Sequence, residues 1–268
     1  MNKIHHFLYK LAAVSFLIIS AFFPGESKAD TKFFARSYTA YTLPAKALEF
    51  EFWQTGRIDK GLGYYSRWQP RFEIEYGVTD RFTASMYFNF NEVKSSGNTI
   101  APKPLSFSTN SIEFRYRLSN PDEYFIDPAL YFEFGYGGDK IFYEPKLLFS
   151  KRFEKFTTVI NVISEIERAP ASSKTESKFE ITAGLAYELN SNIALGVEFR
   201  NHRNFTNIYE KELNQASFIG PTISLFTDKM YFVVNFLAQV AGSPATKNSL
   251  DLNGHEKYEI RTIIGIGL

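Results

Sequence analysis

The sequence contains no cysteine in 268 residues. Disulfide bonds, thiolate metal sites and cysteine nucleophiles are therefore excluded, and any chemistry must use oxygen or nitrogen groups. Net charge is also nearly absent, since 30 basic and 29 acidic residues leave +1. No overall field attracts nucleic acid, so no nucleic-acid partner is expected. Aromatic residues are abundant at 17%, and with 22% charged residues they exclude a disordered chain.

Only the first residues carry a long apolar run. Lys3 and Lys10 precede the stretch 11–23, which has 13 apolar or small residues, and Ser27 and Ala29 suit a signal peptidase. A membrane-spanning helix needs about 20 apolar residues. We therefore interpret residues 1–29 as a signal peptide, which makes the mature chain either an exported soluble β protein or a β-barrel of an outer membrane.

From Leu48 onward, apolar and polar residues alternate as in half-buried strands. Ile112, Phe114 and Tyr116, for example, share one face, and Glu113 and Arg115 share the other. The same pattern predicts twelve strands, at about residues 46–54, 66–76, 82–90, 108–118, 126–136, 141–150, 156–166, 178–189, 193–200, 217–226, 230–240 and 255–268.

The lengths of these segments and of their connections favour a barrel. About ten residues rising about 3.3 Å each, tilted by about 40°, cross an apolar band of about 25 Å. Tight turns follow the even segments, and mostly long polar connections follow the odd ones, including 91–107 and 201–216. The predicted fold is an all-β antiparallel transmembrane barrel of about 12 strands over residues 45–268, with a charged lumen and short periplasmic turns.

A soluble antiparallel sandwich would alternate in the same way and is the alternative. The barrel is favoured because charges crowd the polar face and because aromatic residues fall near the predicted strand ends, as in interfacial girdles. These aromatic residues are Trp53, Tyr64, Tyr65, Trp68, Tyr76, Phe82, Phe90, Tyr136, Phe199 and Tyr258.

Several stretches resemble a known family: residues 64–68, 71–81, 198–203 and 255–261. The chain is similar there to uncharacterised Gram-negative outer-membrane barrels that are classed as a domain of unknown function. It more distantly resembles transporter-like barrels associated with phenol degradation. The resemblance covers nearly all of the mature chain and implies a barrel in the cell outer membrane, with no implied activity.

Strand parity places thirteen acidic and eight basic residues on the inward face. In a narrow lumen these groups must pair, which predicts either a salt-bridge network that fills and stiffens the barrel or a narrow, mildly cation-preferring passage. The predicted lumen charge network consists of Glu49, Glu51, Arg67, Arg71, Glu73, Glu75, Glu113, Arg115, Arg117, Glu133, Glu144, Lys146, Glu198, Arg200, Glu259 and Arg261.

Residues 30–44 fit no strand, because a thirteenth crossing would put the N-terminus outside. With Phe33, Tyr38 and Arg36 they are amphiphilic enough to lie in the periplasmic mouth as a plug, or they form a short lead-in. Of the histidines after residue 29, His202 and His255, neither lies in a nucleophile motif. No catalytic residue, metal site or cofactor is predicted.

The predicted function is that of a narrow channel or transporter for small solutes, without enzyme activity. The alternatives are a lipid-modifying outer-membrane hydrolase centred on His202, and a structural or surface-recognition barrel that uses loops 91–107 and 201–216. The expected partners are outer-membrane lipids, a small solute and the barrel-assembly machinery. The alternating strand that ends at Leu268 would present the signal that this machinery recognises.

Overall fold

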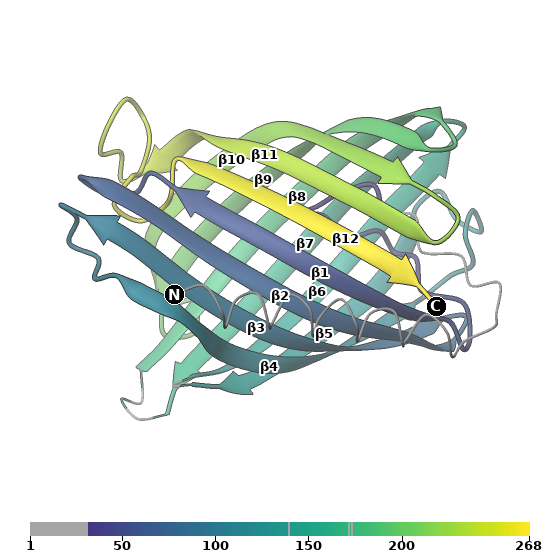
Figure 1. The fold of residues 1–268 in the computed structure, drawn as a ribbon, viewed down its shortest axis with the longest axis horizontal. Coiled ribbons are helices and arrows are strands. Elements are labelled where there is room, and N and C mark those ends of the chain that lie inside the picture. The colour runs from purple at the N-terminus through teal and green to yellow at the C-terminus, as the bar shows by residue number, and fades with distance from the viewer. Residues whose placement is uncertain (1–31, 139, 171, 173) are drawn as a thin grey trace, which may run out of the picture.

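The chain forms a closed barrel of antiparallel strands (Figure 1). The computed structural model describes residues 32–268 except 139, 171 and 173, so the predicted signal peptide lies outside the described residues. Each strand pairs with its sequence neighbours, and β1 pairs with β12 to close the barrel, which confirms the predicted fold. No helix in the described part of the chain is long and apolar enough to cross a membrane.

The twelve strands are β1 (Leu48–Ile58), β2 (Tyr64–Thr79), β3 (Phe82–Ser96), β4 (Lys103–Arg117), β5 (Asp127–Gly137), β6 (Lys140–Phe153), β7 (Phe156–Ala169), β8 (Lys174–Asn190), β9 (Ile193–Thr206), β10 (Lys211–Phe226), β11 (Met230–Ser243) and β12 (Tyr258–Gly267).

The residues that alternate along each strand face the lumen and the outside of the barrel in turn. Along β4, Phe114 and Tyr116 are 43% and 46% exposed, whereas Glu113 and Arg115 are buried. An apolar exterior with a polar interior suits a barrel in lipid, because the closed ladder leaves no backbone group unpaired against hydrocarbon.

The strands are longer than predicted. The expected loop 201–216 is mostly strand, since β9 ends at Thr206 and β10 begins at Lys211, and 91–107 shortens in the same way to 97–102. These added stretches are mostly polar, with a few exposed apolar side chains such as Leu105, Phe107 and Leu213, so regular alternation is lost while the backbone pairing continues. Only 244–257 remains a long connection on this side, which we call the loop side.

Two of the aromatic residues predicted for the girdles lie inside the barrel instead. Trp53 and Tyr65 are only 3% and 6% exposed and line the lumen. Both residues stand at positions of the alternation that face the lumen. The prediction had relied instead on their closeness to a strand end. Tyr64, Tyr76 and Tyr136, by contrast, are exposed on the outside.

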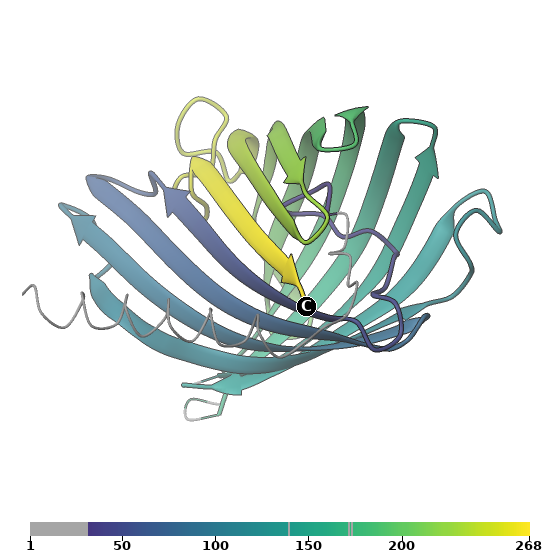
Figure 2. The ribbon, with the colours of Figure 1, turned by 45° about the vertical axis from the view of Figure 1, so that its right-hand side comes forward.

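Residues 32–47, the N-terminal segment, run inside the barrel before β1 begins. In Figures 1 and 2 this purple trace lies between the front and back strands, near the end of the barrel where the C-terminus lies. Short turns such as 80–81 and 191–192 share that end, which the predicted topology makes periplasmic.

Candidate functional site

The N-terminal segment is held by side chains of the lumen wall. Glu198, which is completely buried, accepts the backbone N–H groups of Ala35, Arg36 and Ser37 at 3.0, 2.8 and 2.8 Å. Asn161 Oδ1 accepts the N–H of Tyr38 at 2.7 Å, and its amide donates to the Tyr38 carbonyl at 2.9 Å. Because residues 35–38 pair with no strand, these side chains replace the ladder that would otherwise satisfy their backbone.

Further hydrogen bonds follow the segment around the wall to the periplasmic rim. Ser150 Oγ accepts the N–H of Ala40 at 3.0 Å, and Thr83 Oγ1 accepts that of Leu43 at 3.0 Å. Anchors on β9, β7, β6 and β3 therefore succeed one another along the segment. It lines the lumen as an arc instead of crossing it once.

Aromatic packing fixes the same segment. Phe33 and Phe34 are 2% and 1% exposed, and Tyr38 packs on Trp53 and Tyr131 with ring centroids 6.3 and 5.3 Å away. A Cβ atom at Gly184 would lie 2.5 Å from Cε1 of Phe34, so the absence of a side chain there makes room for the ring.

Two cations of the segment pair with acids of the wall. Lys32 Nζ lies 2.5 Å from Glu51 Oε1, and the Arg36 guanidinium contacts both oxygens of Glu180 and approaches Glu259. Burial alone would lower the pKa of Lys32, but the surrounding carboxylates, led by that of Glu51, outweigh it and raise the pKa above its usual value. The segment therefore carries positive charge into an acidic lumen.

The charges of the lumen separate by depth. Near the periplasmic ends of β1 to β5, beneath the N-terminal segment, lies a cluster of buried carboxylates with buried tyrosine hydroxyls bonded to them. Tyr87 donates to Glu113, Tyr131 to Glu133, and Tyr231 to Glu49 and Glu51. We call Glu49, Glu51, Glu73 and Glu75 the acidic floor.

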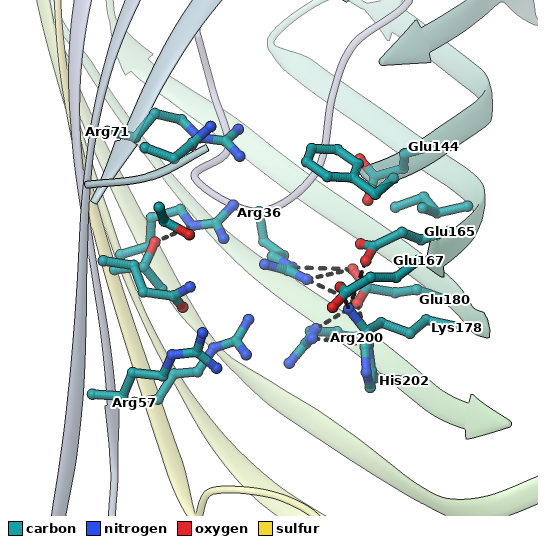
Figure 3. A pocket seen from close by; sticks show the side chains of 18 of the residues that line it. Arg36, Arg57, Arg71, Glu144, Glu165, Glu167, Lys178, Glu180, Arg200 and His202 are labelled. Carbon is teal, nitrogen blue, oxygen red and sulfur yellow. Dashed lines mark hydrogen bonds and ion pairs between the residues drawn. The ribbon is translucent and has the colours of Figure 1, made fainter. Parts of the chain in front are cut away.

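Above the segment lies a cavity of about 520 Å³, the vestibule, which reaches the loop-side residues Lys60 and His255. Figure 3 shows Arg57 and Arg71 on one side of it and Glu144, Glu165 and Glu167 facing them. Ten lysine or arginine side chains and seven glutamates line it. This balance differs from the predicted cation-preferring passage, because the excess acids lie in the floor and not in the cavity.

The acidic side of the vestibule is neutralised locally. Lys178 Nζ contacts Glu165 and Glu167 at 2.5 and 3.1 Å, and Lys146 Nζ lies 2.9 Å from Glu144. Its charges are therefore satisfied within the wall.

The opposite wall is neutralised only in part, since Arg57 pairs with Glu256 and Glu259 and Arg71 lies 3.8 Å from Glu133. Arg57 and Arg67 face each other in the register of β1 and β2. Arg67 donates only to Asn91 at 2.6 Å, and Arg261 donates to Thr55 and to a carbonyl. Among the described residues, neither Arg67 nor Arg261 has a carboxylate within ion-pair distance, so this basic wall keeps uncompensated positive charge.

The loop 244–257 folds back over the vestibule and brings the two histidines together. The rings of His202 and His255 lie 5.4 Å apart. His202 Nδ1 is 2.8 Å from Glu180 and its Nε2 is 3.1 Å from Asn204. Burial, with the neighbouring His202 ring and the positive charges of Arg200, Lys60 and Arg57, lowers the pKa of His255 to about 2, so its ring is neutral at ordinary pH.

The predicted charge network divides into groups. One group belongs to the floor region and consists of Glu49, Glu51, Glu73, Glu75, Glu113, Arg115 and Glu133. A second group lines the vestibule, with Glu133 at its base, and consists of Arg67, Arg71, Glu144, Lys146, Arg200 and Arg261. Glu198 anchors the segment, and Glu259 pairs with Arg57 and Arg200. Arg117 is the exception, because it donates to the carbonyl of Asp80 at the periplasmic rim and stays outside the network.

Several charged residues of the site were missing from the predicted charge network. Lys32 and Arg36 lie in a segment without periodicity, and their partners are far away in sequence. Arg57 lies beyond the predicted end of its strand, although continuing the parity of Glu49 and Glu51 would have placed it inside.

The fold, the apolar exterior and the charged interior define an outer-membrane β-barrel with the architecture of a channel, in contact with membrane lipids. The chain belongs to a family of unknown function (DUF6662), whose model matches residues 26–140 and 122–268. No curated protein matches the chain.

Solved structures with a similar fold include outer-membrane channels and porins. An outer membrane channel from Pseudomonas putida F1 is 13% identical and has a TM-score of 0.62, over 85% of this chain and 98% of that one. The NanC porin is 12% identical with a TM-score of 0.54, over 82% and 100%. The KdgM porin, in complex with disordered oligogalacturonate, is 8% identical with a TM-score of 0.51, over 82% and 99%.

Proposed function

We propose that this protein is a narrow outer-membrane channel for small solutes, that its vestibule binds anionic solutes, and that the N-terminal segment closes the periplasmic half of the lumen. The observation that carries the proposal is the basic wall. Arg67 and Arg261 face a cavity of about 520 Å³, and neither has a carboxylate partner among the residues that the structure describes.

The chemistry of the wall favours a carboxylate-bearing solute. Guanidinium groups present planar, paired donors that fit a carboxylate, and they stay charged at every physiological pH. Arg57 and Arg71 stand beside Arg67 on the same wall. A solute carboxylate would supply the charge that the wall lacks, and the volume of the cavity admits a small molecule.

Passage requires that the N-terminal segment shift. Between residues 35 and 43 its backbone is held by side-chain acceptors such as Glu198 and Asn161 instead of a strand ladder, whereas the barrel closes through β1 and β12 without it. The segment can therefore move while the barrel stays intact.

The experiment is single-channel recording in a planar bilayer with succinate added on the loop side. We expect conductance through the wild-type barrel and a concentration-dependent block by succinate. The double variant Arg67→Gln, Arg261→Gln should weaken the block by about tenfold or more, since two charge-assisted contacts are lost. Lys94→Gln is the matched control, because Lys94 pairs with Glu92 outside the vestibule.

Two results would contradict this assignment. A barrel that never conducts would remove the channel, and equal block of the double variant and the wild type would remove the anion site. Both variants must show the β-sheet circular dichroism of the wild type.

The hydrolase alternative is not favoured. Both ring nitrogens of His202 are engaged, by Glu180 and Asn204, so neither is turned to a serine or threonine hydroxyl. The surface-recognition alternative relied on loops 91–107 and 201–216, most of which are strand. Recognition of the last strand by the barrel-assembly machinery stays a prediction.

A further inference from the structure

The acidic floor sets like charges opposite one another. In the register of β1 and β2, Glu49 lies across from Glu75 and Glu51 from Glu73. All four side chains are at most 3% exposed. Like charges directly opposite each other in a sheet destabilise it, and buried charges persist only with compensation.

The cations nearby compensate Glu51, Glu73 and Glu75 unequally. Lys32 contacts Glu51, and Arg115 lies 2.7 Å from Glu113 but 3.8 Å from Glu75. Within the described residues, Glu73 forms no ion pair, and both of its carboxylate oxygens are buried without a hydrogen-bond donor. Glu73 is therefore a buried carboxyl group that no cation of the described residues pairs with.

The geometry of the floor suits a metal ion. One carboxylate oxygen from each of Glu49, Glu51 and Glu75 lies within 4.8 Å of the others. Some point then lies within about 2.8 Å of all three atoms, close to the Ca²⁺–oxygen distance of about 2.3–2.6 Å. Small side-chain movements would complete the coordination, and Glu73 faces Glu51 as a fourth carboxylate.

We infer that the acidic floor binds a divalent cation of the Ca²⁺ type, with Glu49, Glu51 and Glu75 as ligands and Glu73 as the adjoining carboxylate. Ca²⁺ prefers carboxylate oxygens and tolerates irregular geometry, which fits ligands from two strands. Lys32 shares Glu51 with the ion, so binding of the ion and docking of Lys32 oppose each other. The site is separate from the vestibule and does not depend on the proposed channel function.

Terbium luminescence provides a direct test on the purified, folded barrel. Trp53 Nε1 donates to Glu51, so its indole lies beside the site and should sensitise Tb³⁺ emission. We expect saturable emission that Ca²⁺ displaces. Glu75→Gln and Glu73→Gln should each weaken Ca²⁺ competition by about tenfold or more, because affinity follows the number of carboxylate charges.

Matched variants separate the site from general electrostatics. Glu92→Gln removes one acid at the other end of β3 and should leave the affinity unchanged. Lys32→Met removes the competing ammonium and should tighten binding. The inference is overturned if wild-type barrel shows no saturable, Ca²⁺-displaceable Tb³⁺ emission, as expected if protons alone neutralise the floor, or if Glu92→Gln weakens binding as much as Glu75→Gln.

Discussion

Glu198→Gln tests whether the N-terminal segment is a closure held by one carboxylate. Oε2 of Glu198 accepts the N–H groups of Arg36 and Ser37, and Oε1 accepts those of Ala35 and the Asn235 amide. In glutamine one oxygen becomes an NH₂ group. Two donors then lose their acceptor and face another donor.

The magnitude follows from these contacts. A hydrogen bond to a charged group contributes about 1.5–3 kcal/mol, so two lost bonds amount to about 3–6 kcal/mol. The neutral amide is less costly to bury than the carboxylate, which offsets part of this loss. We expect the segment to be held less firmly by about 2–4 kcal/mol, which raises its displaced fraction on the order of 30- to 1000-fold.

Single-channel recording in planar bilayers measures the effect as the frequency of full openings. A variant lacking residues 30–43 defines the amplitude of the fully open barrel, and Glu92→Gln controls for the loss of one acid. If Glu198→Gln folds with native circular dichroism and opens no more often than the wild type, the segment is not held by Glu198 in the way that the hydrogen bonds indicate.

Two further predictions concern the segment and the loop 244–257. Gly184→Leu should displace the ring of Phe34 from its buried position, which costs about 1.5–3 kcal/mol of hydrophobic free energy and should raise the opening frequency. Unchanged recordings would show that the ring does not anchor the segment. The docked loop holds His255 neutral, so protonation of His255 favours the undocked loop. The free energy of docking should therefore weaken as pH falls below about 6.5, by up to about 1.4 kcal/mol per pH unit. A nitroxide at Ala245→Cys, specific because the chain has no cysteine, should become more mobile on acidification, and His255→Asn should abolish that response.

The barrel was predictable because its cause is local. Alternation along β4 reports directly that Phe114 faces lipid and Glu113 faces the lumen. The strand ends were not predictable from the same signal, since residues 201–206 are paired in a strand although all of them except Phe205 are polar.

The candidate site was predictable only in part, because parity gives the side of a residue but not its depth or its neighbours. Glu51 and Arg117 both face inward, yet one lies in the acidic floor and the other at the rim. The partners of Lys32 and Arg36 depend on a segment that folds back into the barrel, and no periodic pattern in the sequence encodes that path.

The N-terminal segment places its own cations against acidic side chains of the lumen. Removing the segment should therefore change the ion selectivity of the open barrel. Among fully buried charged side chains of the described chain, twelve are acidic and three are lysine or arginine. Lys32 and Arg36 of the segment lie against the acids Glu51 and Glu180. A barrel without residues 30–43 loses both cations and keeps the acids, so its lumen has the acidic excess that parity predicted.

We therefore expect this shortened barrel to prefer cations, which the reversal potential in a KCl gradient measures. Adding Glu73→Gln and Glu75→Gln should reduce the preference, because these carboxylates then line the passage at the acidic floor. An anion-preferring shortened barrel would mean that the floor carries no net charge once the segment has left. The positive vestibule would then govern the whole lumen, and the segment would act as a steric closure alone.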